Sequence, residues 1–342
     1  MQPPLIYSFK NISDLKKSLL STGQLSKGDE KTFDKLIVEA KLPPLLSPTI
    51  LGIILGISPK LITAMTRHPR RNYPYSRTFQ IPKKSGGKRT ILAPRRFLKA
   101  VQKYILRQIL ERQPLPLCVT GFVRKRGIVD NASFHVRSRY MLNADIKDFF
   151  PSVGEEQVFE VFARLGFPKG MSHVLSRLCT YEGQLPQGAP TSPYLANLVF
   201  SEVDQKIMKL AHSHRLTYSR YADDLTFSGS NPFQDNFLDE LTRIIGRYGF
   251  RLNNKKIRFA KPGQAKYVTG FVADERVQPP RDQCRRLRAM FHNAALHPRK
   301  FRKELASLLG WASFVYSYDK VKGKQYMQIA KYVAGLAQAP KT

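Results

Sequence analysis

The spacing of apolar positions predicts helices at both ends of the chain and short strands in its middle. Within residues 1–66, apolar residues recur with a helical period over 14–20 and 32–40, as in an amphipathic helix. Ser58 followed by Pro59 is a typical start for a further helix. We interpret this segment as a helical cap on a larger lobe, and a small DNA-reading helix-turn-helix is the second interpretation.

The middle of the chain alternates strand patterns with helical ones. Residues 77–93 have the pattern of two short strands around a turn at Ser85-Gly86-Gly87, which predicts a hairpin with a basic tip. Ser152 and Glu155 have the spacing of a capping box for a helix that runs to about residue 165. Further strands are expected over 140–146, 215–229 and 266–278, and further helices over 193–212, over 235–248 and from 282 onward. This mixture predicts an α+β fold.

The charge balance narrows the class of partner. The 342 residues include 57 Lys and Arg against 25 Asp and Glu, a net charge of +32. Charge of this size favours a polyanion, because each neutralised phosphate releases condensed counterions. The basic residues are spread along the chain rather than gathered in one amphipathic helix. A nucleic-acid channel is therefore favoured over an anionic membrane surface.

Cysteine usage and hydropathy argue against a secreted or membrane protein. Cys118, Cys179 and Cys284 are far apart and form no C-x-x-C pair, so neither a disulfide framework nor a zinc site is expected. The first ten residues lack an apolar signal core, and the longest apolar run, over 45–57, is broken by proline and glycine. We expect a cytoplasmic protein with no membrane partner.

Three aspartates in apolar surroundings are the candidates for chemistry. Asp145 ends a predicted strand in LNADIKDFF, and Asp223 and Asp224 lie at a strand–turn–strand tip in YADD. Buried carboxylates cost free energy unless paired or bound to metal, and adjacent aspartates repel each other unless a cation lies between them. Magnesium suits such ligands, and two ions can activate a hydroxyl and stabilise a leaving phosphate. A solvated turn is the alternative for the aspartate pair, and the apolar flanks favour metal.

These motifs resemble those of reverse transcriptases. YADD at 221–224 resembles their signature tetrad, LNADIKDFF at 142–150 their first carboxylate motif, and LPQGAPTSP at 185–193 their central motif. Two further motifs resemble the retron branch of the family. They are DNASFH at 130–135, carried by Asn131, Ala132 and His135, and YVTGFV at 267–272, carried by Val268, Thr269 and Gly270. Without the family, His135 would be interpreted as a satisfied histidine and Thr269-Gly270 as a strand bulge.

The resemblance implies a right-hand polymerase fold with an N-terminal helical extension. A helical region over 1–66 would precede fingers and palm over 67–275, with an antiparallel sheet in the palm, and a helical thumb over 276–342. The implied activity is RNA-directed DNA polymerisation, with two Mg²⁺ ions held by the catalytic residues Asp145, Asp223 and Asp224.

The resemblance also implies roles for residues around the aspartates. Phe150 would be the steric gate against a 2′-hydroxyl, with Phe149 in the core. Either Lys83 or Lys84 could meet the triphosphate, and Lys255 leaves the register of Lys256 open. The implied contacts with deoxynucleoside triphosphates are Lys83, Arg89, Phe150, Gln187, Gly188 and Lys256. The implied contacts with RNA are Asn131, His135, Val268, Thr269 and Gly270. The basic C-terminal helices would follow a duplex backbone, and Trp311 would belong to the thumb core.

The retron branch further implies specific partners. A cognate structured noncoding RNA would be copied into single-stranded DNA from a guanosine 2′-hydroxyl, giving the branched product msDNA. The complex would act in antiphage defence with an effector protein. The alternatives are another small bacterial reverse transcriptase, such as a group II intron enzyme, and an RNA-binding scaffold with vestigial polymerase activity.

Overall fold

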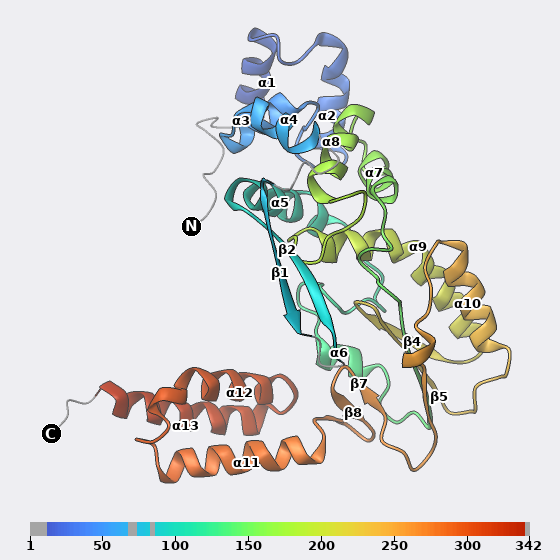
Figure 1. Ribbon diagram of the computed structural model, residues 1–342, viewed down its shortest axis with the longest axis vertical. Helices are drawn as coiled ribbons and strands as arrows, with labels where there is room; N and C mark the ends of the chain where they lie inside the picture. Colours follow the sequence, from blue (N-terminus) through green and yellow to red (C-terminus); the bar gives the residue numbers. More distant parts are fainter. Residues whose placement is uncertain (1–11, 68–73, 83–85, 339–342) are drawn as a thin grey trace. The chain divides into compact units, whose positions relative to one another are not determined.

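Four short helices lie within residues 12–67, and three of them are where the sequence predicts helices. They are α1 (Ile12–Ser21), α2 (Glu30–Val38), α3 (Pro48–Leu55) and α4 (Pro59–Arg67) (Figure 1). A Ser-Pro pair precedes or begins each of the last two. Ser47 Oγ accepts a hydrogen bond from Ile50 N at 3.3 Å, which satisfies one of the free donors at the start of α3. Gly56, with φ of 62°, ends that helix in the left-handed conformation.

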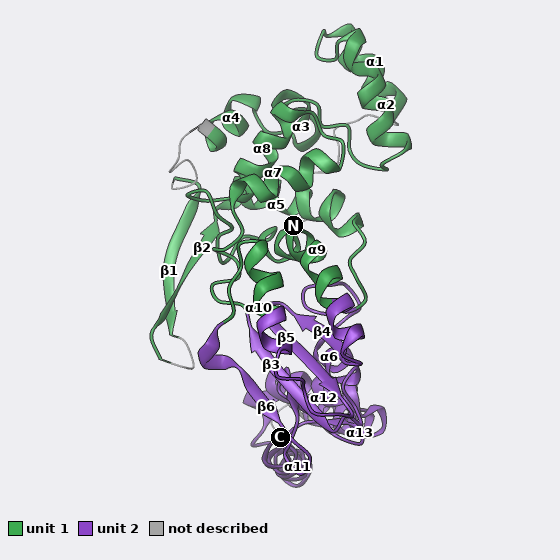
Figure 2. Ribbon diagram, turned by 90° about the vertical axis from the view of Figure 1, so that its right-hand side faces the viewer, with its two compact units in different colours: residues 1–117, 146–207, 241–252 green, residues 118–145, 208–240, 253–342 purple. Residues whose placement is uncertain are grey.

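The computed structural model describes residues 12–67, 74–82 and 86–338, and the chain forms two compact units (Figure 2). Unit 1 comprises residues 1–117, 146–207 and 241–252, and unit 2 comprises residues 118–145, 208–240 and 253–342. The chain therefore passes repeatedly from one unit to the other. The division into 1–66, 67–275 and 276–342 stays a prediction.

Unit 1 contains the predicted hairpin. Strands β1 (Ser76–Pro82) and β2 (Lys88–Pro94) are antiparallel, from Ser76 opposite Pro94 to Pro82 opposite Lys88. Lys83, Lys84 and Ser85 lie outside the described residues. The following helix α5 (Arg96–Gln108) buries the apolar face that the sequence indicates, through Leu98, Val101 and Ile105.

Helix α7 (Glu155–Arg164) begins differently from the prediction, so the Ser152–Glu155 capping box is wrong. Ser152 Oγ instead donates to the backbone carbonyls of Lys147 and Asp148, at 3.2 and 3.0 Å. The hydroxyl is thus used within the preceding turn, a local competition typical of serine. The helix starts after Gly154, whose N–H donates to Gln157 Oε1 at 2.9 Å. The next helices are α8 (Lys169–Cys179), α9 (Ser192–Ser213) and α10 (Phe237–Arg247).

A four-stranded antiparallel sheet forms the centre of unit 2. Its order is β4-β5-β3-β6, and its strands are β4 (Thr217–Tyr221), β5 (Asp224–Gly229), β3 (Tyr140–Asp145) and β6 (Arg258–Ala260). The predicted strand pair over 215–229 is confirmed, with Ala222 and Asp223 as its turn. Met141 and Leu142 of β3 are both fully buried. Because successive side chains of a strand point to opposite faces, both faces of the sheet are covered at this position.

A smaller three-stranded sheet packs with a short helix in the same unit. Strands β7 (Tyr267–Val268), β8 (Phe271–Ala273) and β9 (Val277–Gln278) are joined in chain order. Helix α6 (Ile128–Ser133) contributes Ala132 to a core shared with Met141, Val268 and Phe271.

Three helices complete unit 2: α11 (Arg281–Leu296), α12 (Leu305–Tyr318) and α13 (Lys320–Gln338). Their common core includes Phe291, and Phe291 stacks on Tyr326 with ring centroids 4.0 Å apart. Trp311 packs against this core, which confirms its predicted place. In the described ranges, no helix has the length and apolar character needed to cross a membrane.

Candidate active site

The three aspartates named from the sequence come together at one end of the unit 2 sheet. Strand β3 ends at Asp145 and β5 begins at Asp224, and the two are directly opposite in the antiparallel ladder. Asp223 lies in the turn between β4 and β5. Opposite residues of such a ladder have Cβ atoms about 4.5–5.5 Å apart, so the carboxylates lie within reach of a common cation.

Burial and neighbouring carboxylates oppose the ionisation of Asp223 and Asp224. The pKa of Asp224 is raised to about 6, first by burial and then by the charges of Asp223 and Asp145. Burial and the charge of Asp145 also raise the pKa of Asp223. Positive charge between the groups removes this penalty. The electrostatics of the cluster therefore favour a bound cation.

A lysine ammonium already lies at the cluster. Lys256 Nζ is 2.6 Å from Asp145 Oδ2, and this hydrogen bond raises the pKa of Lys256. Asn253 N donates to the Asp145 carbonyl at 2.8 Å, which ties the short 3-10 helix Asn254–Lys256 to the end of β3. Of the two adjacent lysines considered from the sequence, Lys256 is the one that contacts Asp145.

The YADD turn is held by two residues that the motifs did not indicate. A Cβ on Gly121 would lie 2.4 Å from Ala222 N and 3.0 Å from the Tyr221 carbonyl carbon. The Arg220 guanidinium is fully buried and donates to the Ala222 carbonyl at 2.9 Å. Ala222 itself has φ of 58°, a left-handed conformation that costs a residue with a Cβ about 1–2 kcal/mol. The turn therefore needs this support from its surroundings.

Backbone pairing brings Gly121 to the turn. Arg220 N donates to the Cys118 carbonyl at 2.8 Å, and Thr120 N donates to the Arg220 carbonyl at 2.9 Å. Segment 118–120 thus extends the sheet beside β4. A long-range pairing of this kind leaves no periodic signal in the sequence. The one local hint is an arginine directly before YADD, in a strand whose other side chains are uncharged.

Three of the implied nucleotide contacts lie together in unit 1. Leu92 N of β2 donates to the Gln187 carbonyl at 2.7 Å. Gly188 has φ of 117°, and a Cβ there would lie 2.8 Å from Ile91 Cγ2, so this approach requires glycine. Arg89 and Gln187 line one cavity of about 380 Å³. Lys83, another of the six implied contacts, lies outside the described residues.

Phe149 and Phe150 differ in burial, and Phe149 lies in the core as predicted. The Phe149 ring is buried and lies 5.6 and 6.1 Å from the rings of Phe200 and Phe250. Phe150 is half-buried, with its ring 5.8 Å from that of Phe149. Its role as a steric gate stays a prediction.

Comparison with known proteins decides the family. The family model described as reverse transcriptase (RNA-dependent DNA polymerase) matches residues 81–272, more than half of the chain and including all three aspartates. The chain belongs to the reverse transcriptase family.

Its curated relatives are retron enzymes. The chain is 37% identical to the retron Ec86 reverse transcriptase of Escherichia coli over 264 residues, covering 76% of this chain and 81% of that protein. It is 33% identical to the retron Mx162 reverse transcriptase of Myxococcus xanthus over 300 residues, covering 77% of this chain and 62% of that protein. The protein is thus an RNA-directed DNA polymerase of the retron type.

A telomerase from Candida albicans, solved with the TWJ fragment of telomeric RNA, is similar at a TM-score of 0.48 and 11% identity over 75% of this chain and 63% of that one. Similarity at this level shows neither a shared function nor a shared partner.

A reverse transcriptase domain generally uses divalent metal ions, and the donor set of this reverse transcriptase fits one. It has three carboxylates at adjacent strand ends, and the pKa values of Asp223 and Asp224 are raised. Over the ranges that the structure covers, no three Asp, Glu, His or Cys side chains are already gathered as a metal site. Asp145 is engaged by the Lys256 ammonium instead. A divalent ion would therefore exchange with Lys256 at Asp145.

The N-A-x-x-H residues of the reverse transcriptase lie inside unit 2. The His135 ring is fully buried, with one nitrogen 2.7 Å from Ser228 Oγ and the other 2.7 Å from Ser219 Oγ. Burial lowers the pKa of His135 to about 3, so the ring is neutral. Asn131 Oδ1 accepts hydrogen bonds from Thr120 Oγ1 and Ser219 Oγ, each at 2.8 Å. The predicted role of these residues in RNA recognition stays a prediction.

The V-T-G residues form the turn between β7 and β8. Thr269 and Gly270 have φ of 46° and 86°, as in the two-residue turns that suit hairpins, rather than a strand bulge. Thr269 Oγ1 donates to the Ile128 carbonyl at 3.1 Å, and Val268 is buried in the core that contains Ala132. The N-A-x-x-H motif thus begins within helix α6, and the V-T-G turn contacts that helix.

Proposed function

We propose that this reverse transcriptase copies part of a structured noncoding RNA into single-stranded DNA, starting from a guanosine 2′-hydroxyl of that RNA. The product is the branched RNA–DNA molecule msDNA, and the complex serves antiphage defence together with an effector protein. The observation that carries the proposal is the convergence of three carboxylates on adjacent strand ends in a chain similar to retron reverse transcriptases over about three quarters of its length.

The proposed catalytic residues are Asp145, Asp223 and Asp224, which would hold two Mg²⁺ ions. When bound, the ions activate the attacking hydroxyl and stabilise the leaving pyrophosphate. The protein's own contribution is to keep the carboxylates in register across β3 and β5 and to keep the YADD turn rigid. Lys256 is half exposed, so its ammonium can leave Asp145 and meet the pyrophosphate.

Substrate selection is assigned to residues of unit 1. Arg89 and Lys83 bind the triphosphate, because guanidinium and ammonium groups match phosphate oxygens. Gln187 and Gly188 line the nucleotide pocket, and Gly188 lets that segment approach β2 closely. Phe150 excludes nucleotides that carry a 2′-hydroxyl.

RNA recognition is assigned to the region around helix α6. Because Asn131, His135 and Val268 are buried, they act by fixing the helix and the β7–β8 turn that present other groups to RNA. Thr269 and Gly270 shape that turn. The net charge of +32 supplies long-range attraction for the RNA and for the DNA product.

The division between chemistry and binding is tested by Asp223→Asn combined with Asp224→Asn. We expect DNA synthesis to be abolished and affinity for the cognate RNA to be retained, because the substitutions remove metal ligands and no cation. Asp235→Asn with Asp239→Asn is the matched control, since both side chains are exposed and the charge change is the same. Loss of RNA affinity in the first variant alone would contradict the proposal.

The msDNA assignment is tested on the nucleic acid that co-purifies from cells expressing the native operon. The sample is treated separately with RNase, DNase and a 2′,5′-debranching enzyme. A DNA of fixed length, joined to RNA and released by debranching, is expected. DNA synthesis only on an added primer–template, with no branched product, would favour another small bacterial reverse transcriptase.

A further inference from the structure

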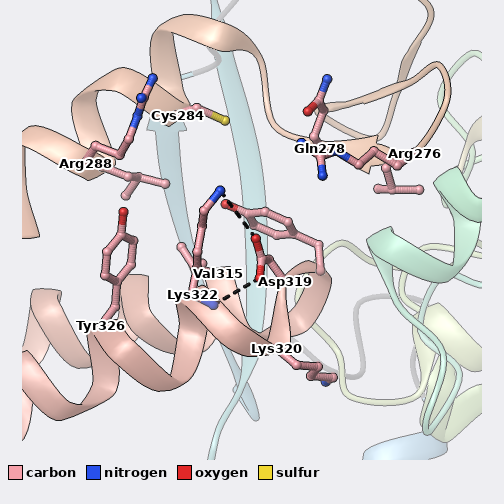
Figure 3. A pocket seen from close by; sticks show the side chains of 12 residues that line it. Arg276, Gln278, Cys284, Arg288, Val315, Asp319, Lys320, Lys322 and Tyr326 are labelled. Atoms are coloured by element: carbon pink, nitrogen blue, oxygen red, sulfur yellow. Dashed lines mark hydrogen bonds and ion pairs between the residues drawn. The ribbon is translucent and has the colours of Figure 1, made fainter.

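A second polar pocket lies among the C-terminal elements of unit 2. It is formed by β9, the first half of α11 and the junction between α12 and α13 (Figure 3). Its volume is about 340 Å³, within the size range of small-ligand sites. The buried side chains of Leu287 and Val315 line its apolar part. None of the residues assigned to catalysis, nucleotide binding or RNA recognition lines this pocket.

The lining carries a strong excess of positive charge. Four basic side chains come from three different parts of the chain: Arg276 before β9, Arg288 on α11, and Lys320 and Lys322 at the start of α13. Asp319 is the single carboxylate among the lining residues. Like charges brought together around a cavity oppose each other unless an anion lies between them.

Asp319 offsets only one of these four charges, because both of its oxygens face Lys322. Its Oδ1 accepts from Lys322 N at 3.0 Å, which caps the start of α13, and its Oδ2 lies 3.6 Å from Lys322 Nζ. Lys320 Nζ lies over the Tyr316 ring, 4.1 Å from its centroid. The guanidinium groups of Arg276 and Arg288 have no ion pair with any carboxylate in the part of the chain that the structure describes.

The neutral groups of the pocket are donors as well. Burial raises the pKa of Tyr318 to about 12, and burial also raises the pKa of Tyr326, so both hydroxyls keep their protons near neutral pH. Figure 3 shows Gln278 beside Arg276 and the Tyr326 hydroxyl directed toward Arg288. A ligand with negative charge and several acceptor oxygens therefore suits this lining.

We propose that this pocket binds a terminal phosphate group, as carried by a free nucleotide or by the end of a nucleic-acid strand. A phosphate monoester offers three acceptor oxygens and close to two negative charges, and guanidinium forks bind it in pairs of hydrogen bonds. The concave lining suits a phosphate at a chain end, because a phosphate within a duplex backbone is flanked by sugars on both sides.

The rate at which Cys284 is alkylated reports whether a ligand occupies the pocket. Its thiol lines the pocket and is half-buried, whereas Cys118 and Cys179 are buried. A ligand in the pocket should slow the alkylation of Cys284. The rate of alkylation is measured on the full chain, without added metal, by peptide mass spectrometry. The probes are guanosine 5′-monophosphate, inorganic pyrophosphate, and one short DNA strand with either a 5′-phosphate or a 5′-hydroxyl. Unreacted Cys118 and Cys179 confirm that the protein stays folded.

The decisive variant is Arg276→Gln with Arg288→Gln. We expect the probe concentration that gives half-maximal protection of Cys284 to rise at least about tenfold. Hydrogen bonds between charged groups are stronger than those between neutral groups. Arg285→Gln with Arg286→Gln is the matched control, because these substitutions remove the same charge. Both arginines are exposed on α11 and neither lines the pocket. The control should shift by no more than about twofold, as expected for long-range electrostatics.

The probes distinguish the source of the phosphate. Protection by guanosine 5′-monophosphate or pyrophosphate assigns the pocket to a free nucleotide or its product, and protection by the 5′-phosphate strand alone assigns it to a strand end. Equal protection by the 5′-hydroxyl strand, an equal loss in both double variants, or no protection by any probe would overturn the proposal. The assay requires no DNA synthesis, so its outcome is independent of the proposed msDNA activity.

Discussion

The approach of Gly121 to the YADD turn makes Gly121→Ala the sharpest test of how the active site is held. The new methyl carbon would lie 2.4 Å from Ala222 N and 3.1 Å from Tyr221 Cα. Ordinary van der Waals contacts begin at 3.4 Å, so the first distance is about 1 Å too short. The opposing atoms are backbone and cannot rotate away. Either segment 118–122 or the turn must move by about 1 Å, and overpacking of this kind costs about 1–3 kcal/mol.

The kinetic consequence should exceed the loss of stability. A displacement of about 1 Å at the reacting groups can lower the rate about 100-fold, because the turn carries Asp223 and leads into Asp224. We expect kcat for primer extension to fall by about this factor, with a loss of a few degrees in Tm. The assay is single-turnover extension with titration of active sites, which separates slow chemistry from a loss of folded enzyme.

A matched glycine provides the control. A Cβ on Gly246 of α10 would meet no neighbouring segment within 4 Å, so Gly246→Ala should leave kcat unchanged and stabilise the helix by up to about 1 kcal/mol. If Gly121→Ala retains kcat per active site within a factor of about three of the parent enzyme, the turn does not depend on this contact. A reduced active fraction with normal kcat would likewise refute the reasoning.

Two further predictions concern charge. Above pH 6.5 His135 is neutral in both the folded and the unfolded state. Below pH 6.5 the unfolded chain protonates this histidine, whereas the folded chain does not, because its His135 pKa is about 3. The free energy of unfolding therefore falls by about 1.4 kcal/mol per pH unit. The urea midpoint of His135→Gln should therefore fall less steeply than that of the parent between pH 6.5 and 5, and parallel curves would contradict the assignment. In Lys256→Met, a divalent ion no longer competes with an ammonium at Asp145. The metal concentration for half-maximal thermal stabilisation should fall by up to about fivefold, the effect of an exposed ion pair, and a rise would show that Lys256 assists metal binding.

The sequence predicted those parts of the site that depend on local pattern. Asp145 and the Asp223-Asp224 pair could be placed at strand ends because alternation and a turn dipeptide specify strand–turn–strand structure. Gly121 and Arg220 could not be found in this way, since a close approach depends on which distant segments pair. The choice of Lys256 over Lys255 also required the fold, because one residue of register in a 3-10 turn decides which side chain meets β3. The Ser152 cap failed for a local reason: a serine hydroxyl has backbone carbonyls within reach that compete with the helix start.

The motifs of the retron branch and of the polymerase centre are parts of one hydrogen-bonded structure. Asn131 binds Thr120 and Ser219, which are the neighbours in sequence of Gly121 and Arg220, the two residues that hold the YADD turn. His135 binds Ser219 from the other side. A change in the N-A-x-x-H motif must therefore reach the catalytic turn through one or two hydrogen bonds. It follows that reduced DNA synthesis in an Asn131 or His135 variant is not by itself a sign of lost RNA recognition, and that RNA affinity and kcat have to be measured separately to assign either residue.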